Sequence, residues 1–305
     1  MIRKVITINE EKCQKCGLCV KICPMRIYTQ ERDGHPVIGD MENCVLCGHC
    51  IAVCPHDAIN HNTLPSGHFI RINNPNPVSE EDLFAALRQR RSVRAFQKQD
   101  VPRDVLYEIA QCCGYCPTGA HGGDGWKRNV IIVTGKENMR QVLEYTTDYM
   151  EILKRKLNGS MVKLISRWVP VIRGGLSTLP DLSLRLDLYR QGKDVILYNA
   201  PALILIHTPN DTATPQADCD AALYAMMLEA QSKGLGTCWM GWVQYAASGF
   251  KVRSFSKLKE FLKVPSSHDV YSAMVLGYPA IKLHSVPYRV TECTWIDQPQ
   301  GLKDI

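Results

Sequence analysis

Eight of the fourteen cysteines occur in two copies of one pattern. Each copy has cysteines at positions i, i+3 and i+6, followed four residues later by a Cys-Pro pair; the copies are Cys13, Cys16, Cys19, Cys23 and Cys44, Cys47, Cys50, Cys54. Thiolates at this spacing are typical ligands of a [4Fe–4S] cube. A zinc site or a disulfide framework is the alternative, but zinc sites rarely combine this spacing with Cys-Pro, and the unit occurs twice. The pattern therefore predicts a protein that handles single electrons.

Residues 1–68 repeat this unit, because each Cys-Pro leads into a short strand-like segment, Ile27-Tyr28-Thr29 or Ala58-Ile59. The repeat resembles the bacterial two-cluster ferredoxin over essentially the whole segment. In that family the fourth cysteine of each run ligates the other cluster. The resemblance therefore implies one cluster on Cys13, Cys16, Cys19 and Cys54, and a second on Cys44, Cys47, Cys50 and Cys23. A unit this small has little core, so we expect the clusters to supply much of its stability.

The length of 305 residues and the ordinary globular composition predict two domains. No run of 18 apolar residues is present, and the N-terminus lacks the apolar core of a signal peptide. Together with the thiolate clusters this predicts a cytoplasmic protein and no membrane span. Residues 1–68 carry seven basic and seven acidic residues, so the net charge of +6 belongs to the remainder. Its basic residues are scattered, which favours an anionic cofactor or substrate over nucleic acid.

The remainder of the chain alternates helical and strand patterns. Asn73-Asn74-Pro75-Asn76-Pro77 marks a linker, and we expect domains at 1–72 and 79–305 with the linker at 73–78. Helices are predicted at 80–89, with Ser79 as N-cap, and at 103–113, 136–157 and 216–233. Buried strands are predicted at 130–133, 202–206 and 273–276. Ala221, Ala222, Ala225, Met226 and Ala230 would form the packing face of the fourth helix. This alternation predicts an α/β or α+β layered domain.

Three segments of this domain could bind an anionic, planar cofactor. The first, Arg90-Arg91-Ser92-Val93-Arg94, offers guanidinium groups that match phosphate oxygens, although a solvated basic helix end is the simpler interpretation. The second, residues 116–126, contains Pro117-Thr118-Gly119 and three further glycines that permit close backbone approach. The third is Gly234-Leu235-Gly236-Thr237-Cys238-Trp239-Met240-Gly241.

These three segments, with Gly277-Tyr278-Pro279 and Pro287-Tyr288-Arg289, resemble the nitroreductase family of flavoproteins over about residues 78–305. The whole chain is similar to ferredoxin–nitroreductase fusions. The resemblance implies an α+β fold with a mixed or antiparallel central sheet flanked by helices, a homodimer, and FMN as cofactor. The FMN contacts that it implies are Arg90, Arg91, Ser92, Arg94, Pro117, Thr118, Gly119, Cys238, Trp239, Met240, Gly241 and Arg289. His121 stands near the family's usual Asn and is either a proton donor or substrate contact, or an ordinary loop histidine.

Residues 160–182 mix Trp, Pro, Arg and Gly between helical segments. We interpret them as either a cover over the flavin or a loop that wraps the partner subunit, and Trp168 and Arg173 are the candidate substrate contacts. The six cysteines outside the two runs show no cluster spacing and are predicted to be structural, although Cys113 and Cys116 have the spacing of a redox pair.

The predicted activity is an FMN-dependent oxidoreductase. Its clusters would pass single electrons to FMN, and FMN would reduce a small organic acceptor, such as a nitro compound or quinone, by hydride transfer from N5. One alternative is a flavoprotein that NAD(P)H reduces and that exports electrons through its clusters. A second is an electron-transfer or redox-sensing protein without a dedicated small substrate. In a third, the flavin domain acts on a specialised metabolite. An external ferredoxin or NAD(P)H is the expected donor.

Overall fold

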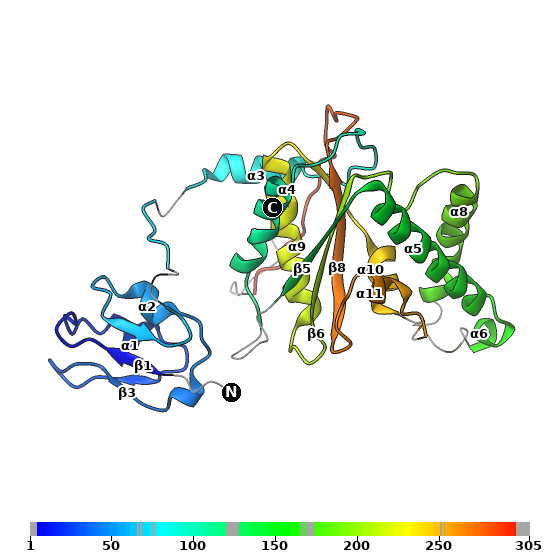
Figure 1. Ribbon diagram of the computed structural model, residues 1–305. Coiled ribbons are helices and arrows are strands. Elements are labelled where there is room, and N and C mark those ends of the chain that lie inside the picture. The colour runs from blue at the N-terminus through cyan, green and yellow to red at the C-terminus, as the bar shows by residue number, and fades with distance from the viewer. Residues whose placement is uncertain are drawn as a thin grey trace.

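The computed structural model describes residues 5–65, 67, 69–74, 77–119, 128–165, 168, 174–250, 252 and 254–296. A small N-terminal unit and a larger C-terminal unit are joined by an extended segment (Figure 1). The domain bounds 1–72 and 79–305 remain a prediction.

The small unit is built from two similar halves. The strands β1 (Ile6–Ile8) and β4 (Ile59–His61) pair antiparallel, and so do β2 (Tyr28–Thr29) and β3 (Val37–Ile38). Each half has a five-residue helix, α1 (Leu18–Ile22) or α2 (His49–Val53), and η1 (Met41–Asn43) precedes the second cysteine run. Both helices follow a glycine with a left-handed backbone, Gly17 at φ 71° and Gly48 at φ 72°. This conformation favours glycine, which explains why Gly occupies the same place in both runs.

A four-stranded antiparallel sheet forms the centre of the larger unit, in the order β5 (Asn129–Thr134), β6 (Ala202–Pro209), β8 (His268–Gly277) and β7 (Gly236–Trp239). Alternate side chains of β6 and β8 enter two separate cores, because neighbouring residues on a strand point to opposite faces. The antiparallel pairing of these strands is one of the two arrangements that the family resemblance implied.

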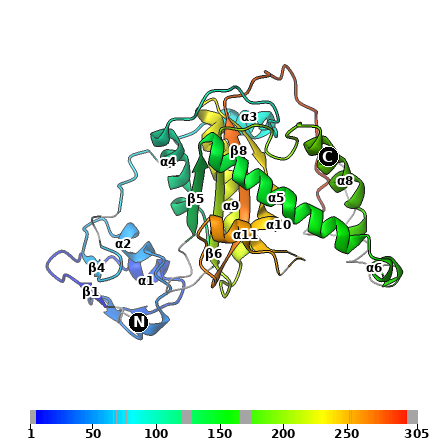
Figure 2. The ribbon, with the colours of Figure 1, turned by 45° about the vertical axis from the view of Figure 1, so that its right-hand side comes forward.

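Helices cover both faces of this sheet (Figures 1 and 2). One layer contains α4 (Arg103–Gln111), the 3-10 turn η3 (Cys112–Tyr115) and α9 (Pro215–Ser232). The other contains α5 (Lys136–Leu157), α8 (Leu179–Arg190), α10 (Gly241–Ser248) and α11 (Lys257–Phe261). The remaining helices are α3 (Glu80–Gln89) and α6 (Ser160–Ile165). The strand order places β7 at one edge of the sheet, beside β8.

The structure confirms the predicted helices at 80–89 and 136–157 with the same bounds, and those at 103–113 and 216–233 to within a few residues. Ser79 caps α3 as expected, because its Oγ accepts a hydrogen bond from Asp82 N at 3.1 Å. Two details were wrong. Of residues 130–133 only Val133 is buried, because β5 is an edge strand. On α9, Ala221 is exposed, and the buried face includes Leu223 and Met227 instead.

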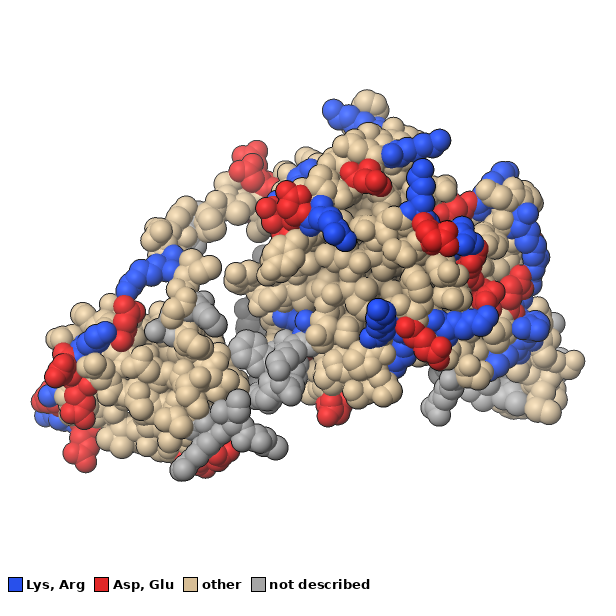
Figure 3. Space-filling model, in the orientation of Figure 1, with Lys and Arg blue, Asp and Glu red and all other residues tan. Residues whose placement is uncertain are grey.

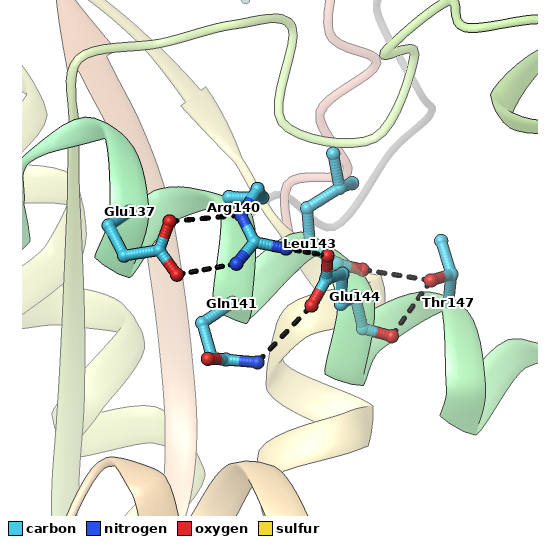
Figure 4. Close-up of polar contacts among 6 residues, drawn as sticks. All are labelled: Glu137, Arg140, Gln141, Leu143, Glu144 and Thr147. Carbon is cyan, nitrogen blue, oxygen red and sulfur yellow. Dashed lines mark hydrogen bonds and ion pairs between the residues drawn. The ribbon is translucent and has the colours of Figure 1, made fainter.

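The surface of α5 carries a network that is local to the helix (Figure 4). Arg140 donates to Glu137, with Nε 3.0 Å from Oε2, and also pairs with Glu144 one turn further on. Gln141 donates to Glu144 at 3.2 Å, and Thr147 Oγ1 donates to the Glu144 carbonyl at 2.8 Å. Pairs at these spacings support a helix modestly, so α5 has surface as well as core reasons to be long.

On the face shown in Figure 3, acidic and basic side chains are interspersed over the larger unit. This mixture agrees with the scattered charges of the sequence and shows no continuous basic stripe on that face. No helix in the described part of the chain is long and apolar enough to cross a membrane.

Candidate functional site

Two cavities in the small unit are each lined by four cysteines. The first is lined by Cys13, Cys16, Cys19 and Cys54. The second is lined by Cys44, Cys47, Cys50 and Cys23. The structure thus gathers the same two sets of four that the ferredoxin resemblance implies, with the fourth cysteine of each run crossing to the other set. Their role as ligands remains a prediction.

The two cavities are equal in size and are lined alike by thiols and apolar side chains, as expected for two equal groups. Within the described residues, no three Cys, His, Asp or Glu side chains are close enough together to hold a single metal ion. Thiols spread around a cavity would suit a cluster better than a single metal ion. Backbone N–H groups also point to sulfur, from Ala58 to Cys54 Sγ at 3.3 Å and from Leu46 to Cys44 Sγ at 3.4 Å.

In the larger unit, the arginine-rich segment lies along the free edge of the sheet. Ser92 forms a parallel bridge with Thr237 of β7, and Val93 N donates to the Thr237 carbonyl at 2.9 Å. This approach requires a glycine at 236, because a Cβ there would lie 2.5 Å from Val93 Cγ2. The first and third predicted cofactor segments are therefore in direct contact.

The arginines of this segment point to two sides. Arg90 and Arg91 line a surface pocket with residues 234–237 and 281–286, whereas Arg94 lines another with Tyr198 and the start of α5. Arg91 Nη1 donates to the Arg90 carbonyl at 2.7 Å, but its Nε is buried without a partner among the described residues. A buried donor of this kind needs an acceptor, and a phosphate oxygen would supply one.

The corner between β7 and α10 contains Cys238, Trp239, Met240 and Gly241. Met240 N donates to the Ala273 carbonyl at 2.8 Å, so this N–H is used by the sheet. Gly241 opens α10, and the N–H groups of a helix's first turn have no acceptor within the helix. Gly241 is thus the better backbone donor for a flavin. Trp239 is about one-third exposed, whereas Cys238 is buried.

Positive charge surrounds the Cys238 thiol. Burial raises its pKa, while Arg94, the Ser92 hydroxyl and Arg185 act in the opposite direction. Arg185 was not predicted from the sequence. It is fixed by Asp181 at 2.8 Å and by the Val195 carbonyl at 2.7 Å. No motif surrounds it, so only the structure identifies it as a cation near the cofactor segments.

The second predicted segment is anchored to the N-terminal turn of α9. Asp218 accepts hydrogen bonds from Thr118 Oγ1 at 2.7 Å and from Gly119 N at 2.9 Å. Thr214 Oγ1 adds a third at 2.9 Å, and the pKa of Asp218 is lowered by these donors against the effect of burial. A Cβ on Gly119 would lie 2.1 Å from Thr214 Oγ1, so this position also requires glycine.

Arg128 completes this anchor, and the sequence analysis missed it together with Asp218. Its guanidinium donates to the carbonyls of Cys113 and Cys116, both at 2.7 Å, of Pro117 at 2.8 Å, and of Asp218 at 3.1 Å. Burial raises the pKa of the Cys113 and Cys116 thiols, which keeps them neutral and agrees with the structural role predicted for them.

The other predicted residues are not gathered into this site. Arg289 lies in an extended, exposed segment, and Trp168 is 84% exposed. His121 and Arg173 lie outside the described residues. Their predicted roles therefore rest on the sequence alone.

The fold and the cysteine cavities define a redox protein with an iron–sulfur unit ahead of a flavoprotein-type α+β unit. Residues 12–59 match the 4Fe-4S dicluster domain, and residues 87–278 match the nitroreductase family. The chain belongs to the nitroreductase family of oxidoreductases, with a dicluster domain at its N-terminal side. The predicted family and order of domains are confirmed.

Several solved structures are similar. A Bacteroides fragilis nitroreductase with bound FMN is 21% identical, with a TM-score of 0.50, and the match covers 72% of this chain and 100% of that one. A Desulfitobacterium hafniense nitroreductase with bound FMN is 19% identical, with a TM-score of 0.50, covering 70% and 97%. These likenesses establish the fold.

Two curated relatives are iodotyrosine deiodinases. The mouse protein is 24% identical over 206 residues, which are 67% of this chain and 64% of that protein. The human protein is 26% identical over 132 residues, or 42% of each. The chain therefore spans less than two thirds of the length of these relatives.

Proposed function

We propose that this protein is an FMN-dependent oxidoreductase that takes up single electrons at two [4Fe–4S] clusters and uses them to reduce a small organic acceptor. The observation that carries the proposal is the presence, in one chain, of two four-cysteine cavities and a nitroreductase-family unit. When bound, FMN would supply the conversion of single electrons into a two-electron hydride transfer.

The chain's own residues would bind and orient the flavin. Arg90, Arg91 and Ser92 would hold the phosphate, since the buried Nε of Arg91 lacks an acceptor in the described part of the chain. Arg94, on the opposite side of the same segment, would contact the ring edge. The Gly241 N–H would donate to the ring at N5, where a backbone donor stabilises the reduced form and needs no side chain. Arg289 is proposed as a further phosphate contact, from the C-terminal segment.

A homodimer with shared flavin sites fits the positions of the three segments. Residues 117–119 are fixed at the N-terminal end of α9, whereas Gln231 near its other end donates to the Ala86 carbonyl, beside the arginine segment. An 18-residue helix is about 27 Å long. Within one chain the loop and the arginines are therefore far apart, and a second copy could supply its own Pro117-Thr118-Gly119 to the flavin.

Exposed apolar side chains also support the homodimer. On α3, Leu83 and Phe84 are about half exposed, and the C-terminal segment 281–296 exposes Tyr288 and Ile296 almost completely. Exposed apolar surface marks interaction sites. A second copy is the proposed partner, since shared flavin sites require one.

The acceptor is proposed only as a class. A nitro compound or quinone fits an accessible reduced flavin, and Trp168 and Arg173 are the proposed substrate contacts. Because two relatives are iodotyrosine deiodinases, iodinated phenols are further acceptors to test.

The direction of electron flow can be tested with anaerobic, reconstituted protein. We expect reduced ferredoxin to bleach the flavin absorption of the intact protein, and to fail with the Cys47→Ser variant, which would lose its cluster chemistry while keeping FMN. NAD(P)H should leave the flavin oxidised. If NAD(P)H reduces the flavin equally fast in both proteins, electrons enter at the flavin and the proposal is wrong.

A further inference from the structure

The internal repeat allows the two cysteine cavities to be compared position by position. The two runs are 31 residues apart, as Cys13 and Cys44 show. Most residues that line one cavity have a counterpart at this spacing in the other, including Gly17 and Gly48, and Ala58 and Ile27. Where the counterparts differ in chemistry, the two clusters would differ in environment.

The main difference is at Tyr28, whose counterpart is Ile59. Tyr28 lines the cavity of Cys44, Cys47, Cys50 and Cys23, and Ile59 lines the other. The Tyr28 hydroxyl is buried, and its polar neighbour among the described residues is the Cys50 sulfur. A thiol is a weak acceptor, so this hydroxyl has no strong hydrogen-bond partner there. A thiolate or sulfide of a bound cluster would supply one.

A second donor faces the same cavity. His61 is buried, and its Nε2 lies 3.8 Å from Cys44 Sγ. The other ring nitrogen, Nδ1, accepts the Thr63 N–H at 3.0 Å and therefore carries no proton. The proton of the neutral ring must then be on Nε2, so this nitrogen donates toward the sulfur.

The first cavity has no side-chain donor at these two positions. Gln14 and His56 also line it, but among the described residues neither is hydrogen-bonded to a cysteine sulfur. The counterpart of His61 is Gln30, whose amide donates to the carbonyls of Lys15 at 2.9 Å and of Gly34 at 2.8 Å. Ile59 has no polar group. Among the described residues, the hydrogen bonds found to the Cys13, Cys16, Cys19 and Cys54 sulfurs come from the backbone.

Hydrogen bonds to cluster sulfurs stabilise the reduced, more negative state and raise the reduction potential. We propose that Tyr28 and His61 tune the cluster held by Cys44, Cys47, Cys50 and Cys23 to a higher potential than the cluster held by Cys13, Cys16, Cys19 and Cys54. This inference rests on the proposed ligand sets and deepens the proposed function. In a partly reduced protein, the first electron would reside on the cluster next to Tyr28. The other cluster would be reduced last.

The Tyr28→Phe variant tests this inference, because it removes one oxygen atom and keeps the ring. In an anaerobic redox titration followed by electron paramagnetic resonance, the wild type should show two distinct midpoints. In the variant, the equilibrium constant for reduction of the higher-potential cluster should fall about tenfold. Its midpoint potential would then be lower by about 59 mV for a one-electron couple. The lower midpoint should not move. Ile59→Val, at the matched position of the other cavity, alters packing without a hydrogen bond and should move neither midpoint.

A second readout reports the donor directly. After exchange into D₂O, pulsed resonance spectra of the partly reduced wild type should contain an exchangeable deuteron coupled to the cluster, and Tyr28→Phe should lose it. Equal midpoints in the wild type, or equal shifts of both midpoints in Tyr28→Phe, would overturn the inference. If the wild type binds no stoichiometric iron and sulfide, the ligand assignment itself has failed, which iron analysis distinguishes.

Discussion

The contact between the arginine segment and β7 predicts a sharp effect of the substitution Gly236→Ala. A Cβ at position 236 would lie 2.5, 2.7 and 2.9 Å from the Cγ2, Cβ and Cγ1 atoms of Val93. Ordinary contacts between carbon atoms are about 3.5–4.0 Å, so the two segments must separate by about 1 Å. Val93 cannot avoid this by rotating, because its own Cβ is among the atoms in conflict. The Val93 N to Thr237 O hydrogen bond would be stretched as well.

Overpacking of this size costs about 1–3 kcal/mol. We therefore expect Gly236→Ala to lower the free energy of unfolding by this amount in urea denaturation. If the displaced arginines also bind FMN, its affinity should fall about 5- to 150-fold, since each 1.4 kcal/mol is about tenfold. Fluorescence titration of the apoprotein with FMN measures this loss.

The double variant Gly236→Ala, Val93→Gly removes all three conflicting atoms and should recover most of the FMN affinity. Gly114→Ala is a suitable control, because a Cβ there would meet no atom within 4 Å. If Gly236→Ala binds FMN as tightly as the wild type, the arginine segment does not position the cofactor through this contact, and the reasoning is refuted.

Two further predictions follow from buried polar groups. Asp218→Ala removes the acceptor of three hydrogen bonds that fix the loop start at Gly119. We therefore expect about 3 kcal/mol less stability in denaturation and a loss of bound FMN, measured as flavin content. Substitution of an exposed residue, Asp211→Asn, should change neither. Burial and His268 lower the pKa of His207 from 6.5 to about 4. The unfolded chain then binds more protons between these values, so stability should fall by about 2 kcal/mol between about pH 7 and pH 5. His207→Asn should lack this part of the pH dependence, and an unchanged profile would contradict the assignment.

The sequence predicted features that depend on local chemistry. The cysteine runs and their resemblance to two-cluster ferredoxins implied the grouping that the cavities have, and Ser79 marked the start of α3. The strand β7 was missed, because Gly236-Thr237-Cys238-Trp239 has neither alternation nor an apolar run. The exposure of β5 was also missed, since a strand's place at the edge of a sheet is decided by its neighbours and not by its own residues.

The anchor of the 117–119 loop lay beyond sequence reasoning for a different reason. Asp218 stands 100 residues from Thr118, and a single acidic residue in the first turn of a helix is ordinary. Arg128 likewise appears as one of 36 basic residues. Only the fold brings its guanidinium to four carbonyl groups, so its importance is a property of tertiary structure.

The crossing of the fourth cysteines has a consequence for the integrity of the small unit. Cys23 lines the cavity of the second run, and Cys54 lines that of the first. With those ligands, neither half of the repeat could supply all four cysteines of a cluster by itself. Oxidative damage at one cluster would release a cysteine belonging to the chain segment that encloses the other, so both clusters should be lost nearly together. The repeat is therefore one cooperative module, and a truncation between residues 24 and 43 should abolish both clusters at once.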